Sequence, residues 1–210
     1  MKQPDRGRGP RGGGQAMRGV RERNVFFAFL PWIIFDVVAG PSTWELAAFA
    51  ALVATIVLGL PDLLRGAVKL LDITGVAFFA VISVLGLVVD RHQLIWLETY
   101  SQTIAGGVLA VVALGSLAFV PFTEQYARES THPQVWATPA FKRTNRVLTA
   151  MWGTVFLLTA VLGLIALHVG SGTDWLNWIV PAILLVLAIR ITHWYPEYVR
   201  EQARRRSQAG

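Results

Sequence analysis

Cysteine is absent from this 210-residue sequence, and charged residues are scarce. The lack of cysteine excludes disulfide bonds, thiolate zinc sites and cysteine-ligated iron–sulfur clusters. Only 15% of the residues are charged, whereas soluble domains carry roughly 25%. With 54% apolar residues and a mean hydropathy of +0.49, the composition is typical of a chain that folds in lipid.

Recognisable catalytic motifs are also missing. The sequence has no glycine-rich phosphate loop, no helical metalloprotease pair of histidines and no nucleophile elbow. No two histidines are predicted at one depth of the membrane core, which argues against a haem with two histidine ligands. His92 and His168 do fall on the same, outer side. We therefore predict a non-enzymatic protein with no catalytic residue, no metal site and no cofactor.

Long apolar blocks make up most of the chain. A helix that rises 1.5 Å per residue needs about 20 residues to cross a hydrocarbon core of about 30 Å. Five blocks meet this length, whereas the first is short and contains Pro31 and Asp36. The pattern predicts an all-α integral membrane protein, a six-transmembrane-helix bundle with short interfacial helices on the cytoplasmic side. The predicted spans are approximately 25–39, 44–60, 73–89, 99–120, 147–169 and 175–192.

The distribution of Lys and Arg predicts the topology, because short cytoplasmic connections are enriched in these residues. If all six blocks cross, 18 of the 19 basic residues lie inside and only Arg91 lies outside. Both termini are then cytoplasmic, and the cytoplasmic (inner) membrane is the expected location. The predicted organisation is a disordered Gly/Arg-rich tail (1–24), a transmembrane domain (25–193) and a basic tail (194–210).

Small residues recur at helical spacing and predict close helix packing. One series, Ala47, Ala51, Thr55 and Gly59, lies in the second block. The fourth block offers Gly107 and Gly115, and the fifth offers Gly153 and Gly163.

Asp36 is the most unusual residue, because a carboxylate at mid-bilayer costs at least about 2.5–3.5 kcal/mol. It is a candidate proton carrier or substrate contact. Otherwise it is a carboxylate without a function of its own, either near the outer interface or bonded to a neighbouring helix. His168 is a second candidate polar residue on the outer side. With His92 and Glu98, these residues leave open a weaker third hypothesis, an enzyme that acts on lipid.

Two connections carry distinctive side chains. The charges Asp62, Arg65, Lys69 and Asp72 follow spacings of three, four and three, which predicts one helical stripe lying flat in the interface. The longer connection, 121–146, mixes aromatic and basic residues and predicts an interfacial helix, a kink and a re-entry. Asn145, just before the fifth block, is a predicted helix N-cap.

Short stretches of the sequence resemble the intracellular septation protein A family of bacterial inner-membrane proteins. They are 30–35 (LPWIIF), Pro139 and 143–145 (RTN), followed by an apolar helix with Trp152. Phe141 stands where the family usually has tryptophan. The resemblance implies a role in septation, cell division or envelope integrity through partners or lipids. Pro31, Arg143 and Asn145 are the residues that align with motif positions.

Two functional hypotheses remain open. The preferred one is a non-enzymatic membrane protein of the cell envelope that contacts lipids, other membrane proteins or a second copy of itself. The alternative is a small transporter or channel that uses Asp36. The basic tails are expected to contact anionic headgroups. We expect no nucleic-acid binding, because no aromatic residue that could stack on a base precedes Phe26.

Overall fold

The computed structural model describes residues 25–40, 43–89, 91–169 and 175–208, and every regular element in these ranges is helical. The predicted tail 1–24 lies outside the described residues. The elements are α1 (Val25–Val38), α2 (Trp44–Leu64), α3 (Leu70–Val88), α4 (Arg91–Ser116), α5 (Phe122–Ser130), α6 (Pro133–Trp136), α7 (Pro139–Val169), a π-helical segment η1 (Trp175–Ile179) and α8 (Val180–Gln208).

Three helices of the described chain are long and apolar enough to cross a membrane: α2, α3 and α7, with 21, 19 and 31 residues. α1 is apolar but has only 14 residues. Large apolar side chains on these helices remain uncovered, such as Val57 at 61% and Leu87 at 86% exposure. Because water would oppose such exposure, the helices suggest a multi-pass membrane protein.

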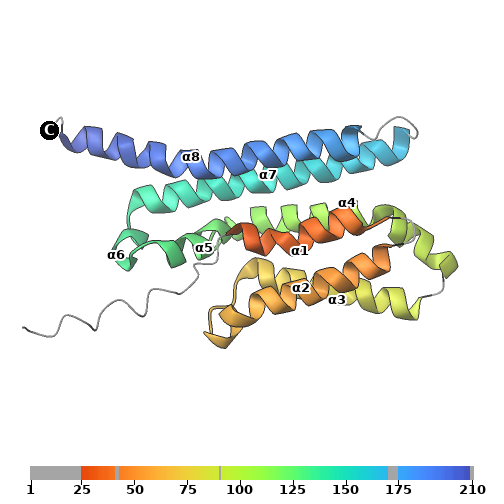
Figure 1. The fold of residues 1–210 in the computed structure, drawn as a ribbon. Helices are drawn as coiled ribbons and strands as arrows, with labels where there is room; N and C mark the ends of the chain where they lie inside the picture. The colour runs from red at the N-terminus through yellow and green to blue at the C-terminus, as the bar shows by residue number, and fades with distance from the viewer. Residues whose placement is uncertain (1–24, 41–42, 90, 170–174, 209–210) are drawn as a thin grey trace, which may run out of the picture.

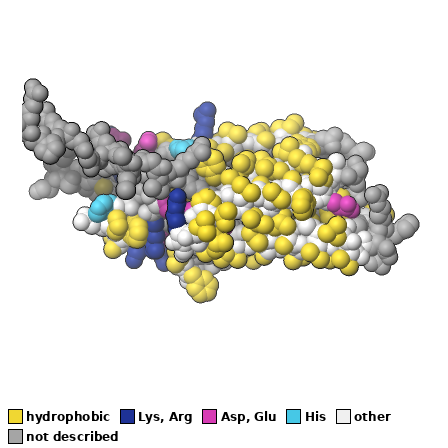
Figure 2. Space-filling view, turned by 60° about the horizontal axis from the view of Figure 1, so that its bottom comes forward, with side chains coloured by type: hydrophobic (Ala, Val, Ile, Leu, Met, Phe, Trp, Pro, Cys, Tyr) yellow, Lys and Arg dark blue, Asp and Glu magenta, His cyan; other side chains and the backbone are white. Residues whose placement is uncertain are grey.

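The long helices run side by side along one direction (Figure 1). α1 packs against α2, α3 and α4, α4 packs along α7, and α8 packs against α7. The α2–α3 turn, α5, α6 and the start of α7 lie together at one end of the bundle (Figure 1). We call this the basic end, because Arg65, Lys69, Arg128 and residues 142–146 of α7 lie there. Figure 2 shows Lys and Arg gathered toward this end, beside a broad hydrophobic face.

Small residues bring the helices into close contact. A Cβ added at Gly153 would lie 2.5 Å from Leu114 Cδ2, and one at Gly163 would lie 2.7 Å from Thr103 Oγ1. Both glycines therefore allow α7 to approach α4 closely. On α2, the predicted small face is also confirmed, since Ala47, Ala51 and Thr55 are buried.

The packing face predicted for α4 is wrong. A Cβ at Gly107 or Gly115 would meet no atom within 4 Å, whereas one at Gly106 would lie 3.5 Å from Ala160 Cβ. Neighbouring residues in a helix point about 100° apart, as follows from 3.6 residues per turn. A helix that is apolar on most sides gives little periodic signal to choose between such faces.

Three helices begin earlier than the hydropathy pattern predicts, and the first of them, α3, begins at Leu70 rather than at 73. α4 begins at Arg91 rather than at 99, and it ends at Ser116 rather than at 120. α7 begins at Pro139 rather than at 147. The Phe141 amide donates to Thr138 Oγ1 (3.3 Å), so Thr138 caps this helix and Pro139 takes its first position. Hydropathy detects the apolar part of each helix and misses its polar first turns.

The connection between α2 and α3 is not the flat interfacial helix predicted for 62–72. The α2 helix stops after Leu64, Gly66 adopts φ +72°, and Lys69 is extended. Only glycine adopts such a φ readily, so the chain reverses here and the stripe is interrupted. Asp62, Lys69 and Asp72 are buried instead of facing lipid headgroups.

Candidate functional site

A buried lysine fixes α5 against the α2–α3 turn. Lys69 Nζ lies 2.8 Å from Asp62 Oδ2 and 2.6 Å from Glu129 Oε1, and only 4% of its side chain is exposed. The ammonium also lies 4.6 Å from the centre of the Tyr126 ring, a cation–π contact. Beside it, the Leu70 amide donates to Gln125 Oε1 (2.9 Å). These contacts position α5 as one wall of a cavity at the basic end.

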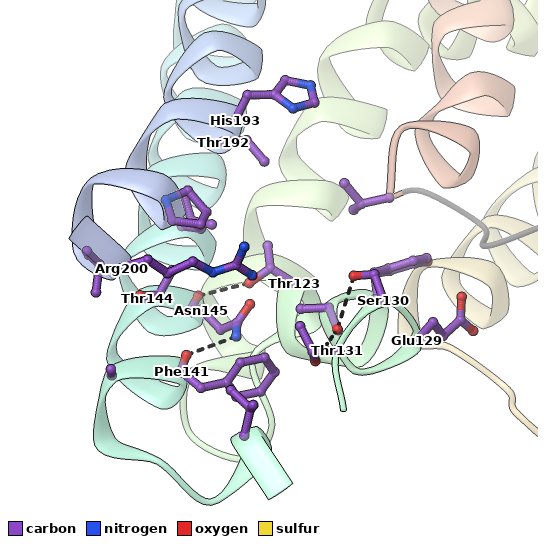
Figure 3. Close-up of a pocket in the computed structure, with 18 of the residues that line it drawn as sticks. Thr123, Glu129, Ser130, Thr131, Phe141, Thr144, Asn145, Thr192, His193 and Arg200 are labelled. Carbon is purple, nitrogen blue, oxygen red and sulfur yellow. Dashed lines mark hydrogen bonds between the residues drawn. The ribbon is translucent and has the colours of Figure 1, made fainter. Parts of the chain in front are cut away.

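The cavity has a volume of about 410 Å³ and lies among α5, α7, α8 and the first residues of α1. Its apolar walls come from side chains such as Phe26, Val135, Phe141 and Leu148. Hydroxyl and amide groups are mixed with them, as Figure 3 shows for Thr123, Thr131, Thr144 and Asn145. An apolar pocket with a few convergent polar groups is the usual form of a small-molecule site.

A hydrogen-bonded network forms the polar side of this cavity. Thr123 Oγ1 lies 2.9 Å from Asn145 O and 2.8 Å from Thr149 Oγ1. Asn145 Nδ2 donates to Phe141 O (2.9 Å). All three polar residues are at least 95% buried, and buried hydrogen bonds between side chains rigidify their surroundings. The network therefore holds α5 and α7 in a fixed relation.

The predicted role of Asn145 as an N-cap is wrong. It lies inside α7, six residues after Pro139, and its side-chain amide bonds back to Phe141 one turn earlier. The residue nevertheless lines the cavity. Its presence there follows from the earlier start of α7, which the apolar pattern does not reveal.

Arg200 gives the cavity a positive charge. It extends from α8 toward Thr123 and Asn145 (Figure 3), and its side chain is exposed. His193 also lines the cavity and stacks on Phe26, with 5.2 Å between the ring centres. The one acidic residue among those lining the cavity, Glu129, is already paired with Lys69. An anionic group would therefore meet a cation that forms no ion pair with an acid of the described chain.

Asp36 lies in a different cavity, farther from the basic end. That cavity is about 260 Å³ in volume and is bounded by α1, α4, α7 and η1–α8. Gln102 lines it with Asp36, and the Gln102 side-chain amide donates to the backbone oxygens of Asp36 (2.8 Å) and Ala39 (3.1 Å). The structure thus places Asp36 beside Gln102, a partner that sequence reasoning missed.

The other predicted residues lie apart from both cavities. His168 is exposed near the end of α7, where its Nδ1 lies 2.8 Å from Leu164 O within the same helix. Arg143 is exposed on α7 and lines neither cavity. The side chains of His92 and Glu98 lie outside the described residues. The structure therefore does not join Asp36 with His168 in one site.

Sequence reasoning missed Thr123, Glu129 and Arg200 as a group. The signal available was the helical spacing of Phe122, Tyr126 and Glu129 in the connection, which marks one face of a helix that should be covered. That spacing could not indicate that the α2–α3 turn covers this face, because Lys69 of the turn precedes Glu129 by 60 residues.

Within the described ranges, no group of three or more His, Cys, Asp or Glu residues is placed to hold a metal ion. No protein-family model, curated protein or solved structure matches the chain. The arrangement of the two cavities is therefore the basis for assigning a function.

Proposed function

We propose that this chain is a non-enzymatic membrane protein of the cell envelope that binds the headgroup of an anionic phospholipid in the cavity among α5, α7 and α8. The observation that carries the proposal is Arg200, a cation with no acidic partner in the described chain, beside a floor of hydroxyl and amide groups. Apolar walls next to these groups suit the glycerol and upper acyl part of a lipid.

The depth of the cavity supports the same proposal. It lies at the basic end, beside the connections of the bundle, while the uncovered apolar side chains extend along the long helices. The headgroup region of a bilayer is expected at this level, and anionic lipid attracts cations there by about 1 kcal/mol each.

Six membrane spans form part of the proposal: α1, α2, α3, α4, α7 and η1–α8. Support comes from the helices that lie at all six predicted blocks and from the cations gathered at one end. By the positive-inside rule, that end is cytoplasmic. The short α1, which contains Pro31, spans with local thinning of the bilayer.

The cellular role is proposed from the resemblance to the septation protein family. The lipid-bound protein would support envelope integrity or septation through contacts with lipids or other membrane proteins. A deletion strain should then show envelope stress sensitivity or division defects. The wild-type chain should restore normal growth, and Arg200→Gln should restore it less well. Normal stress resistance and division after deletion would contradict this role.

Lipid binding can be tested on the purified full-length chain in nanodiscs or mild detergent. Phosphatidylglycerol should bind in preference to phosphatidylcholine, and Arg200→Gln should weaken phosphatidylglycerol binding about fivefold, which corresponds to about 1 kcal/mol for one interfacial cation. Native mass spectrometry and lipid titration measure both effects. Inorganic phosphate is titrated in parallel, because tight phosphate binding without lipid preference would indicate a soluble anion as the ligand.

Two variants make this test specific. Arg205→Gln removes an exposed cation of the same helix that is paired with Glu201 (2.6 Å) and lies outside the cavity; its binding should match wild type. Ala140→Trp fills the cavity without a change of charge, and it should reduce binding as Arg200→Gln does. Equal phosphatidylglycerol affinities of the wild type and the variants Arg200→Gln, Arg205→Gln and Ala140→Trp would show that the lipid is attracted only to the surface. That result would overturn the proposal.

A second candidate, a small transporter, is favoured by one observation. Both cavities are lined by residues of α1, α7 and α8, and Phe29, which lines the smaller one, stacks on Trp152 with 4.8 Å between ring centres. Such an arrangement could open alternately to each side of the membrane. Liposome flux assays test it: Asp36→Asn should abolish flux, and absence of flux for every candidate solute would remove this function.

A further inference from the structure

The cavity that contains Asp36 is a cleft between two helices that do not pack along each other there. α1 packs against α2, α3 and α4, while α8 packs against α7. α1 and α8 meet nearer the basic end, where Phe26 stacks on His193. The cleft lies farther from the basic end than the Phe26–His193 contact, and α4 and α7 form its floor through Gly106, Thr159 and Gly163.

The charge in this cleft is a single carboxylate. Asp36 is accessible from the cleft, two residues before α1 ends. No ion pair or hydrogen bond to its carboxylate is formed within the described part of the chain, and no Lys, Arg or His lines the cleft. Gln102 cannot serve as the missing partner, because its amide group is bonded to the Asp36 and Ala39 backbone oxygens.

The remaining groups of the cleft also favour a cation. Thr159 donates its hydroxyl proton to Val155 O (2.9 Å), so its oxygen is left as an acceptor. Phe29, Trp32, Phe156 and Trp178 supply aromatic surface, and aromatic faces attract organic cations. Acceptors, one acid and aromatic walls together select a positively charged group with an apolar body.

The position of the cleft indicates how such a ligand would enter. Ile33, Val37 and Trp178 line the cleft and are 38%, 64% and 52% exposed, on surfaces that face lipid in the proposed topology. An apolar tail can therefore remain in the bilayer while its charged group reaches Asp36. The volume of about 260 Å³ is sufficient for a substituted ammonium group and part of its chain.

We propose that the cleft between α1 and α8 binds an amphiphilic organic monocation, such as an alkylammonium, with Asp36 as its counter-ion. The site goes beyond the anionic-lipid site, because it lies in another cavity and selects the opposite charge. Either site can fail its test without affecting the other.

The test uses the full-length chain in nanodiscs and radiolabelled decyltrimethylammonium as the probe. Wild type should bind the probe saturably, and Asp36→Asn should bind it at least about tenfold more weakly, because the quaternary ammonium loses its Coulomb attraction to a nearby carboxylate. Decyl sulfate, which has the same tail and the opposite charge, should show no saturable binding. Asp36→Asn is expected to fold, because it removes a charge from an apolar setting.

Two further variants complete the design. Glu45→Gln removes an exposed carboxylate of α2 that does not line the cleft, and it should bind like wild type. Ala182→Trp fills the cleft and keeps Asp36, and it should lose binding. Unchanged affinity in Asp36→Asn, or equal binding of decyl sulfate, would show that the probe only partitions into lipid and would overturn the proposal.

Discussion

Lys69 shows how one side chain joins segments that are distant in sequence. It is buried between Asp62 and Glu129, so two acids and one base share a space with little water. Loss of one partner from such a cluster is strongly destabilising, because the remaining charges stay buried without compensation. Lys69 therefore holds α5, and with it the wall of the larger cavity.

Lys69→Met should destabilise the protein by about 3–5 kcal/mol, the usual effect of breaking a buried ion pair. Thermal unfolding of the purified protein, followed by tryptophan fluorescence, measures the loss. Arg65→Met is the matched control, because Arg65 lies 3.9 Å from the same Asp62 carboxylate but is 54% exposed. The control should change stability by no more than about 1 kcal/mol. Similar losses in both variants would contradict a special role for Lys69.

At the scale of elements, the contact between α4 and α7 joins helices α1–α4 to the pair α7 and α8. Gly106 faces Ala160, while Gly153 and Gly163 face Leu114 and Thr103. In lipid, helices associate through close packing more than through hydrophobic burial, so small residues at such a contact matter.

Gly153→Ala should destabilise the protein by about 1–3 kcal/mol, because the new Cβ would lie 2.5 Å from Leu114 Cδ2 and overpack the interface. Gly107→Ala places a methyl group where no atom lies within 4 Å. It should leave stability unchanged or raise it by up to about 1 kcal/mol through helix propensity. Melting curves of the two variants test the assigned face of α4. A larger loss for Gly107→Ala would mean that the helix is rotated.

At the scale of the whole molecule, the two ends of the bundle differ in charge. The α2–α3 turn, α5 and α6 carry or adjoin basic residues. α1 ends and α2 begins at the opposite end of the bundle (Figure 1), where the described residues 39, 40 and 43 carry no charge. If the basic end is cytoplasmic, each connection has a defined side of the membrane.

The absence of cysteine allows this topology to be tested with single-cysteine variants. In intact cells, Thr43→Cys should react with a membrane-impermeant maleimide. Arg65→Cys and Ala137→Cys, both at exposed positions of the basic end, should react only after permeabilisation. Labelling of Thr43 and Ala137 from the same side would contradict the proposed six spans.

The sequence by itself determined where the long helices lie and where the cations gather. Lipid demands long apolar stretches and disfavours charge, so these features are local and can be read directly from composition. Helix ends were less well predicted, as with Pro139, because polar first turns do not alter the apolar pattern.

Only the tertiary structure decided which side chains meet. The bond from Leu70 to Gln125 and the bond from Gln102 to Asp36 join residues 55 and 66 positions apart. The face of α4 and both cavities depend on the same kind of distant contact. Helices that are apolar on nearly every side carry little information about which face will pack, so this choice is made when the helices assemble.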